Sequence, residues 1–256
     1  MNKISVVILT KNEEKHIRGC LESVKWADEI IILDSFSTDR TLGIAREFTD
    51  KVYQKDFTGF PKQRHEALQF TSNSWVFMVD SDMVIPQELK EEIKEKFSRS
   101  LEEYSAFKFR FLTVYFGKGI RHCGWYDPNN TRLFNKEKGN FNTSLRYLDD
   151  FIPKGKVGIM KNHILHFGQE NISEYVIRLE RYSTLNAEDL MSKGYRISHF
   201  NVFFYFLIKP TMVFLYKFIY KRGFLDGIEG LMVCITSAIT YCISYLKLWE
   251  KQKTHV

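Results

Sequence analysis

Three runs of apolar residues in the first eighty positions predict buried strands, and a shorter stretch between them predicts one more. The runs are Ile4–Thr10, Glu29–Asp34 and Trp75–Val79, and the shorter stretch is Lys51–Gln54. Continuous runs of β-branched and large apolar side chains are typical of parallel strands that are covered on both faces. The first part of the chain is therefore expected to build a buried sheet.

Stretches with a helical spacing of apolar residues separate these strands. After Asn12, four apolar residues recur at this spacing over residues 17–24. Further helices are predicted over residues 37–48, 61–71 and 86–99. Ser37 and Thr38 are candidate caps for the first of these three, because their hydroxyls can accept from free backbone N–H groups. Strands that alternate with helices in this way predict a doubly wound α/β domain.

The pattern changes after residue 100. Residues 107–111 alternate between apolar and basic side chains, as a half-exposed strand does. Short strands are predicted at Arg132–Phe134 and Ile164–Phe167, and loops over residues 118–130 and 136–158. From Ile172 onwards the pattern is helical.

The C-terminal segment is unusually apolar. Residues 201–220 are interrupted by Lys209 and Lys217, and Leu231–Leu246 carries no charge over 16 residues, just short of the length that crosses a bilayer. Aromatic and basic residues flank both stretches, which favours a pair of helices at a membrane interface. A buried helical hairpin and a transmembrane hairpin stay open as alternatives.

Composition narrows the class of protein. The chain has 256 residues, is 44% hydrophobic, and carries 37 Lys and Arg against 31 Asp and Glu, a net charge of +6. This apolar content supports a sizeable core and excludes wholesale disorder. Most of the positive excess lies in the apolar C-terminal segment. We therefore expect a membrane surface as the partner and no nucleic acid.

The cysteines and the N-terminus indicate the compartment. Neither a CxxC motif nor a zinc-ligand spacing connects the four cysteines, which are Cys20, Cys123, Cys234 and Cys242. They are expected to be free thiols in a reducing compartment. The first apolar run is too short for a signal peptide, so the catalytic part is expected to face the cytosol.

Acidic and polar residues follow three of the predicted strands. Asp80 and Asp82 come directly after the strand that ends at Val79, while Thr10–Glu13 and Asp34–Asp39 follow the first two strands. Ligands of open α/β sheets bind at the carboxyl ends of the strands, and carboxylates there suit Mg or Mn shared with a diphosphate. Because the chain contains neither GxGxxG nor GxxxxGK[ST], Rossmann and P-loop sites are excluded. The pattern predicts a nucleotide held by side chains and a metal.

Motifs along nearly the whole chain resemble a known family. ISVVILTKNEE, DSFSTDRT and WVFMVDSD are similar to family 2 glycosyltransferases of the GT-A fold. GFPKQRHEAL, GWYDPNNTRLF, LERYSTLNAEDL, RGFLDGIEGL and YLKLWE resemble the WaaE-type lipopolysaccharide core β-glucosyltransferase branch. The resemblance implies a GT-A α/β domain over residues 1–170 and an α-helical, membrane-associated region over residues 171–256.

The resemblance also implies roles for individual residues. The donor-binding residues would be Thr10, Asn12, Glu13, Asp34, Lys62, Arg64, Asp80 and Asp82. Asp34 would accept from uracil N3, and Asp82 with His166 would hold Mg or Mn. The acceptor side would include Trp125, Tyr126 and Arg132. From the residues alone, Lys62 and Arg64 also fit a solvated helix face, and His166 also fits a core histidine.

The chain departs from the family at the expected catalytic base. Relatives carry a Val-His-Glu element where this chain has Thr143–Tyr147, and an inverting transferase needs a carboxylate there to deprotonate the acceptor. The candidate substitutes are Asp127, Asp149 and Asp150. Phe36 and His65 also replace the family's usual Gly and Asn.

The implied function is transfer of a hexose, with inversion, from a UDP-sugar to a lipopolysaccharide-core or other lipid-linked acceptor. It would take place on the cytoplasmic face of a bacterial inner membrane, with the protein peripheral or monotopic. The alternative is a catalytically impaired or non-catalytic membrane-surface protein that retains the nucleotide-sugar fold.

Overall fold

The computed structural model describes residues 2–144, 151–168 and 171–254. The chain forms two compact units. Among the described residues, the first contains 2–112, 127–144 and 151–167, and the second contains 113–126, 168 and 171–254.

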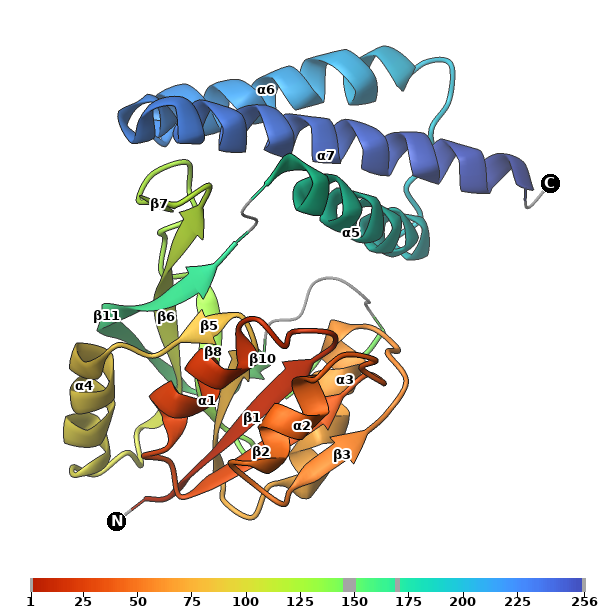
Figure 1. The fold of residues 1–256 in the computed structure, drawn as a ribbon. Helices are drawn as coiled ribbons and strands as arrows, with labels where there is room; N and C mark the ends of the chain where they lie inside the picture. The colour runs from red at the N-terminus through yellow and green to blue at the C-terminus, as the bar shows by residue number, and fades with distance from the viewer. Residues whose placement is uncertain (1, 145–150, 169–170, 255–256) are drawn as a thin grey trace. The chain divides into compact units, whose positions relative to one another are not determined.

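A mixed sheet is the centre of the first unit (Figure 1). Its strand order is β3-β2-β1-β4-β8-β6-β11-β5. The parallel strands are β1 (Ile4–Thr10), β2 (Glu29–Asp34), β3 (Val52–Gln54) and β4 (Trp75–Asp80). The remaining strands are β5 (Met83–Val84), β6 (Tyr104–Tyr115), β8 (Asn130–Asn135) and β11 (Lys156–Phe167). β8 is antiparallel to β4 and marks the change of direction in the sheet.

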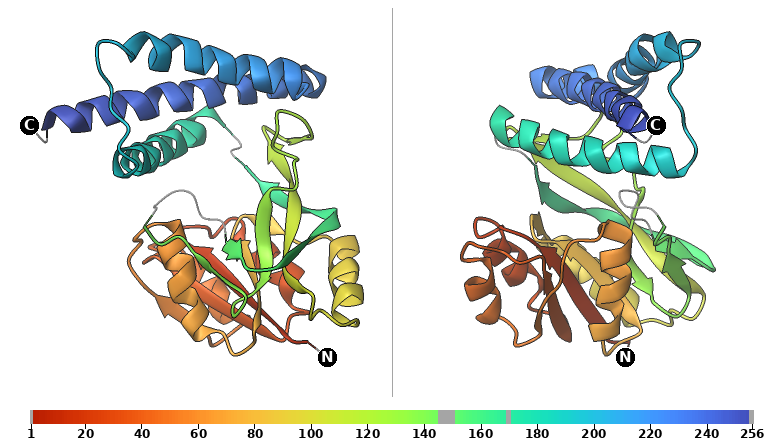
Figure 2. Two further views of the ribbon diagram at one scale, coloured as in Figure 1. Left: turned by 180° about the vertical axis from the view of Figure 1, so that it is seen from behind. Right: turned by 90° about the vertical axis from the view of Figure 1, so that its right-hand side faces the viewer.

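Successive side chains of a strand point to opposite faces of the sheet. Because the parallel strands are apolar almost throughout, both faces of the sheet are covered by helices. One layer contains α1 (Ile17–Val24), α2 (Thr41–Arg46) and α4 (Gln87–Phe97). These helices pack with Val6 and Ile8 of β1, whereas Val7 packs on the other face with Ala67 of α3. α3 (Phe60–Ala67) and the 3-10 turn η1 (Leu68–Phe70) lie on that second face (Figure 2, left).

The first four predicted strands and the helices between them are confirmed, but two local expectations are wrong. Ser37 and Thr38 cap no helix, because α2 begins at Thr41 and both residues bond to the neighbouring loops instead. The expected loops also contain the strands β7 (Lys118–Ile120), β9 (Gly139–Phe141) and β10 (Phe151–Pro153). Aromatic packing between distant residues supports the last two, since Phe141 and Phe151 both contact Phe134.

The second unit is a helical assembly with a β-hairpin. Its helical elements are α5 (Ile172–Ser192), η2 (Phe204–Ile208), α6 (Lys209–Leu215), η3 (Tyr216–Tyr220), η4 (Gly223–Asp226) and α7 (Gly227–Thr254). η2 and η3 are π-helical turns and η4 is a 3-10 turn. α7 packs against both α5 and α6 (Figure 1).

Residues 113–126 belong to this second unit, although the sequence pattern places them within residues 1–170. Tyr115 and Cys123 are buried together with Cys234 of α7. A side chain at Gly223 would place its Cβ within 3 Å of both cysteine sulfurs, at 2.8 and 2.9 Å, so glycine is required for this close packing. The grouping depends on contacts about a hundred residues apart in sequence, which local patterns do not reveal.

Candidate active site

The polar ends of β1, β2 and β4 meet at one edge of the first unit's sheet, as the sequence predicts. Thr10 pairs with Asp34 across β1 and β2, and Leu9 pairs with Asp80 across β1 and β4. Thr10 and Asp34 are buried. In the described part of the chain, Thr10 Oγ1 has no hydrogen-bond partner. A buried hydroxyl of this kind can bond to a ligand at the carboxyl edge.

Hydrogen bonds fix the loops that follow β1 and β2 against each other. Asn12 Oδ1 accepts from the backbone N–H of Thr38, and the Asn12 N–H donates to Ser37 Oγ, both at 2.8 Å. The Glu13 N–H donates to Thr41 Oγ1 at 2.8 Å. Asn12 has a φ of 53°, a left-handed conformation that asparagine tolerates better than most residues. Asn12 and Glu13 therefore shape the edge through their loops.

Asp34 is oriented by its neighbours. Its Oδ2 accepts from the Ser37 N–H at 2.8 Å and from Gln54 Nε2 at 3.1 Å, and its Oδ1 accepts from Ser37 Oγ. Behind it, Gln63 Nε2 donates to Ser35 Oγ at 2.8 Å. Gln54 and Gln63 are not predicted from the sequence, because each bonds to a residue twenty or more positions away.

Two buried arginines hold Asp80 at the end of β4. Arg64 Nη2 lies 2.7 Å from Asp80 Oδ1, and Arg132 Nη2 lies 3.2 Å from Asp80 Oδ2. Burial raises the pKa of Asp80, but Arg132 and Arg64 lower it by more, so its pKa lies below the ordinary value and the carboxylate is charged. Arg132 Nη1 has no hydrogen-bond partner in the described part of the chain. The cluster carries one positive charge in excess, which suits an anionic ligand.

Asp82 and His166 form a second pair beside this cluster. His166 Nε2 lies 3.4 Å from Asp82 Oδ2, and both side chains are largely buried. The described residues contain no group of three or more His, Cys, Asp or Glu side chains that could hold a metal. Two protein ligands still fit Mg or Mn, because such ions commonly take one or two side chains and complete their shell with substrate phosphates and water.

His16, which lies on the same loop as Glu13, is another residue of this edge that is not predicted from the sequence. His16 Nδ1 is 3.1 Å from Glu13 Oε2, and its ring stacks on Phe167 at 5.9 Å between centroids. The hydrogen bond with Glu13 raises the pKa of His16 and outweighs the opposing effect of burial. The spacing of three residues between Glu13 and His16 was the available signal.

Comparison with known proteins decides the family. Residues 5–143, more than half of the chain, match the profile of the family described as glycosyl transferase family 2. The chain belongs to this family. An uncharacterized glycosyltransferase of Rickettsia typhi is 31% identical over 98% of this chain and 88% of its own length. The lipopolysaccharide core biosynthesis glycosyltransferase LpsC of Rhizobium meliloti is 26% identical over 97% of this chain and 92% of its own length.

A solved structure shares the fold of this glycosyltransferase. Glucosyl-3-phosphoglycerate synthase of Mycobacterium tuberculosis, in complex with Mn2+, UDP-glucose and phosphoglyceric acid, superimposes with a TM-score of 0.51 and 19% identity. The match covers 77% of this chain and 81% of that protein. The likeness confirms the expected GT-A α/β fold, and the structure itself confirms the helical C-terminal region.

Other predicted site residues of the glycosyltransferase lie elsewhere. Lys62 is exposed on α3. Trp125 and Tyr126 belong to the second unit, where Trp125 contacts Tyr115 edge-on at 5.5 Å and Arg121 lies 5.3 Å above the Tyr126 ring. Asp127 is half-buried in the first unit. Asp149 and Asp150 lie outside the described residues.

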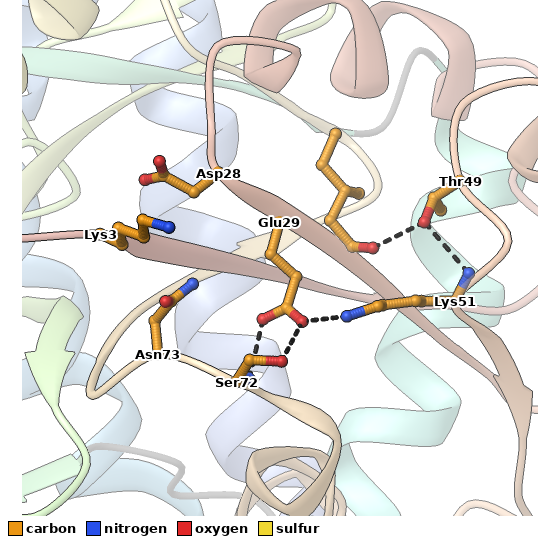
Figure 3. Close-up of a pocket in the computed structure, with 8 residues that line it drawn as sticks. Lys3, Asp28, Glu29, Thr49, Lys51, Ser72 and Asn73 are labelled. Atoms are coloured by element: carbon orange, nitrogen blue, oxygen red, sulfur yellow. Dashed lines mark hydrogen bonds and ion pairs between the residues drawn. The ribbon is translucent and has the colours of Figure 1, made fainter.

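A separate hollow of about 380 Å³ lies at the amino ends of the same strands (Figure 3). Glu29 is at its centre and accepts from Ser72 and from Lys51 Nζ. Burial raises the pKa of Glu29, but hydrogen bonds from Lys51, Ser5 and Ser72 outweigh it and lower the pKa to about 2. These groups satisfy Glu29 internally, so we assign the hollow a structural role.

Proposed function

We propose that this glycosyltransferase transfers a hexose from a UDP-sugar to a lipopolysaccharide-core or other lipid-linked acceptor, with inversion and with Mg or Mn as cofactor. The observation that carries the proposal is the cluster of Asp80, Arg64 and Arg132 beside the pair of Asp82 and His166 at the carboxyl ends of the parallel strands. The name of LpsC supports the class of acceptor, and the UDP-glucose complex of the mycobacterial synthase supports the class of donor.

In this proposal, different residues contact the base, the nucleoside and the diphosphate of the donor. Asp34 accepts from the imide N–H of the base, and Thr10 Oγ1 bonds to the nucleoside, while Asn12 and Glu13 hold the two loops in place. Arg64 and Arg132 stabilise the charge that develops on the departing diphosphate, and Asp80 keeps both arginines in position. Asp82 and His166 hold the divalent cation, which when bound supplies further positive charge to that leaving group. Lys62 is an exposed cation on α3, the helix that also carries Arg64, and is a further candidate to contact the donor.

The acceptor side needs a carboxylate that takes the proton from the attacking hydroxyl. Asp127 is the candidate within the described residues, and Asp149 and Asp150 are the others. Trp125 and Tyr126 offer aromatic faces for an acceptor sugar. Arg132 Nη2 lies 3.2 Å from Asp80 Oδ2, which supports a role with the donor in place of the acceptor role that the family resemblance implies.

The proposed location is the cytoplasmic face of a bacterial inner membrane. Among the described residues, one helix, Gly223–Lys253, is long and apolar enough to cross a membrane by length and composition, with a mean hydropathy of 1.6. The basic and aromatic residues around it suit lipid headgroups. A lipid-linked acceptor is presented at this surface, where nucleotide sugars are available.

Hydrolysis of UDP-sugars tests the proposal without an acceptor. The purified chain should release UDP from at least one UDP-hexose in Mg2+ or Mn2+ and lose this activity in EDTA. Asp82→Asn should abolish the release, and Asp50→Asn, which changes an exposed carboxylate on a loop, should leave it unchanged. UDP binding without any turnover of donor or acceptor would favour the non-catalytic alternative, and absence of UDP binding would overturn the donor assignment.

A further inference from the structure

The helical segment over residues 203–220 has an inverted distribution of apolar and charged side chains. Its exposed positions recur every three or four residues, and all but Thr211 are apolar. Phe203, Leu207, Met212, Leu215, Ile219 and Tyr220 are each between 45% and 73% exposed. A helix on the surface of a water-soluble protein shows the opposite pattern, with its apolar stripe towards the core. We call this side of the segment the outward apolar face.

The charged residues of the same segment point towards the protein. Lys209 Nζ donates to Tyr245 Oη of α7 and lies 5.0 Å from the centre of that ring. Lys217 Nζ donates to the carbonyl oxygen of Cys123 at 3.2 Å. The lysines of this segment point inward, and its exposed residues are apolar. We therefore expect this face to be most stable in contact with lipid hydrocarbon.

The other flank of α7 argues against a transmembrane hairpin. Tyr175 Oη of α5 donates to the carbonyl oxygen of Thr236 at 2.9 Å, and Lys247 Nζ pairs with Glu180 at 3.0 Å. The Glu180 side chain is 71% exposed. If α7 crossed a bilayer, the charged pair of Glu180 on α5 and Lys247 on α7 would enter the hydrocarbon, which is unfavourable. α7 is long enough to cross a bilayer. Its contacts with α5 nevertheless favour a position outside the hydrocarbon, in contact with water.

Cations bracket the outward apolar face. Lys193 and Arg196 precede it, and Lys221 and Arg222 follow it. If two copies of the chain packed through this face, parallel or antiparallel, cations would meet cations at both ends and repel. Anionic lipid headgroups complement the same arrangement. Charge therefore favours a lipid surface over a second copy.

We propose that the outward apolar face enters one leaflet of an anionic membrane while α5 stays in water, so that the second unit is a monotopic anchor. The proposal rests on the membrane location put forward above. The proposal specifies which face contacts lipid. It favours an anchor in one leaflet over the transmembrane hairpin and the buried hairpin, the two alternatives that the sequence leaves open for this segment.

Vesicle binding with matched variants tests the face. In 3:1 phosphatidylethanolamine and phosphatidylglycerol vesicles at 0.5 M NaCl, the full chain should sediment with lipid. Met212→Glu with Ile219→Glu should lower the partition coefficient at least tenfold. The control, Val176→Glu with Ile177→Glu, changes two exposed apolar residues of α5 and should alter it less than twofold. Equal losses from both pairs, or a wild-type chain that stays in the supernatant, would overturn the proposal.

Oligomeric state and sidedness complete the test. A wild-type chain that is dimeric without lipid and becomes monomeric only in the Met212 and Ile219 variant would assign the face to self-association and overturn the lipid assignment. Arg222→Cys should react with a membrane-impermeant maleimide in inverted inner-membrane vesicles but not in intact spheroplasts. Labelling in spheroplasts, or from neither side, would contradict a monotopic anchor.

Donor hydrolysis separates this proposal from the proposed function. All four substituted positions lie in the second unit, so the paired variants should release UDP from the donor at the wild-type rate. A wild-type chain that binds vesicles but never releases UDP would refute the function and leave the anchor standing. A chain that releases UDP but does not bind vesicles would refute the anchor and leave the proposed function standing.

Discussion

Asp80 shows at the scale of one residue why a carboxylate paired with two buried arginines differs from a surface one. Asp80→Asn would leave Arg64 and Arg132 without their shared negative partner, and removing one member of a buried ion cluster costs about 3 kcal/mol. Urea unfolding at pH 7 should measure this loss. Glu103→Gln breaks an exposed pair with Lys156 and should leave the unfolding midpoint nearly unchanged. Equal midpoint shifts would contradict the buried cluster.

His166 and His163 offer a matched pair on a single strand. Both lie on β11, and a separation of three residues directs their side chains to opposite faces of the strand. His166→Asn should raise the Mn2+ concentration for half-maximal UDP release about tenfold, while His163→Asn should not. A metal titration of UDP release measures both. An unchanged titration in His166→Asn would remove that residue from the metal shell.

At the scale of elements, Glu29 joins the amino ends of neighbouring strands. It starts β2 and bonds to Ser5 on β1, to Lys51 before β3 and to Ser72 before β4. Its pKa is about 2 in the folded chain against an ordinary 4.5. A lowered pKa stabilises the fold above the ordinary value, and this stabilisation is lost as pH falls from 4.5 towards 2.

Glu29→Gln should therefore flatten the dependence of unfolding free energy on pH between 4.5 and 2. Because Lys51 is partly exposed, solvent screens the pair and we expect a loss of about 1–2 kcal/mol over this interval in the wild-type chain. Urea unfolding at several pH values measures it. A variant with the wild-type slope would mean that other carboxylates cause the acid sensitivity.

At the scale of the whole molecule, the two units should respond differently to donor. UDP with Mn2+ at a hundred times the Kd stabilises the folded state that binds it by about 2.7 kcal/mol. Since the proposed site lies in the first unit, that unit's thermal transition should rise, and the transition of the helical unit should not. Calorimetry measures the thermal transitions. Tryptophan fluorescence of two variants, one with Trp75 substituted and one with Trp125 substituted, assigns each transition to a unit. Equal shifts in both would show that the units unfold as one.

Local patterns of residues were sufficient to predict several parts of the protein. The strands β1 and β2 and the buried face of α1 were predicted because continuous apolar runs and helical spacing are properties of neighbouring residues. The polar strand ends were predicted to meet because parallel strands align their carboxyl ends. The family followed from motifs that the chain carries in order.

Contacts between residues that are distant in sequence could be learned only from the folded chain. Arg132 contacts Asp80 across 52 positions, so its place beside Asp80 and Arg64 could not be predicted from its neighbours in the sequence. The hairpin over residues 113–126 joined the helical unit because its core is completed by α7. Apolar content with basic and aromatic flanks favours a membrane interface for residues 201–220, but an almost uniformly apolar helix does not indicate which side faces outward. The inward hydrogen bonds of Lys209 and Lys217 fixed that side, because each lysine found its partner in another element.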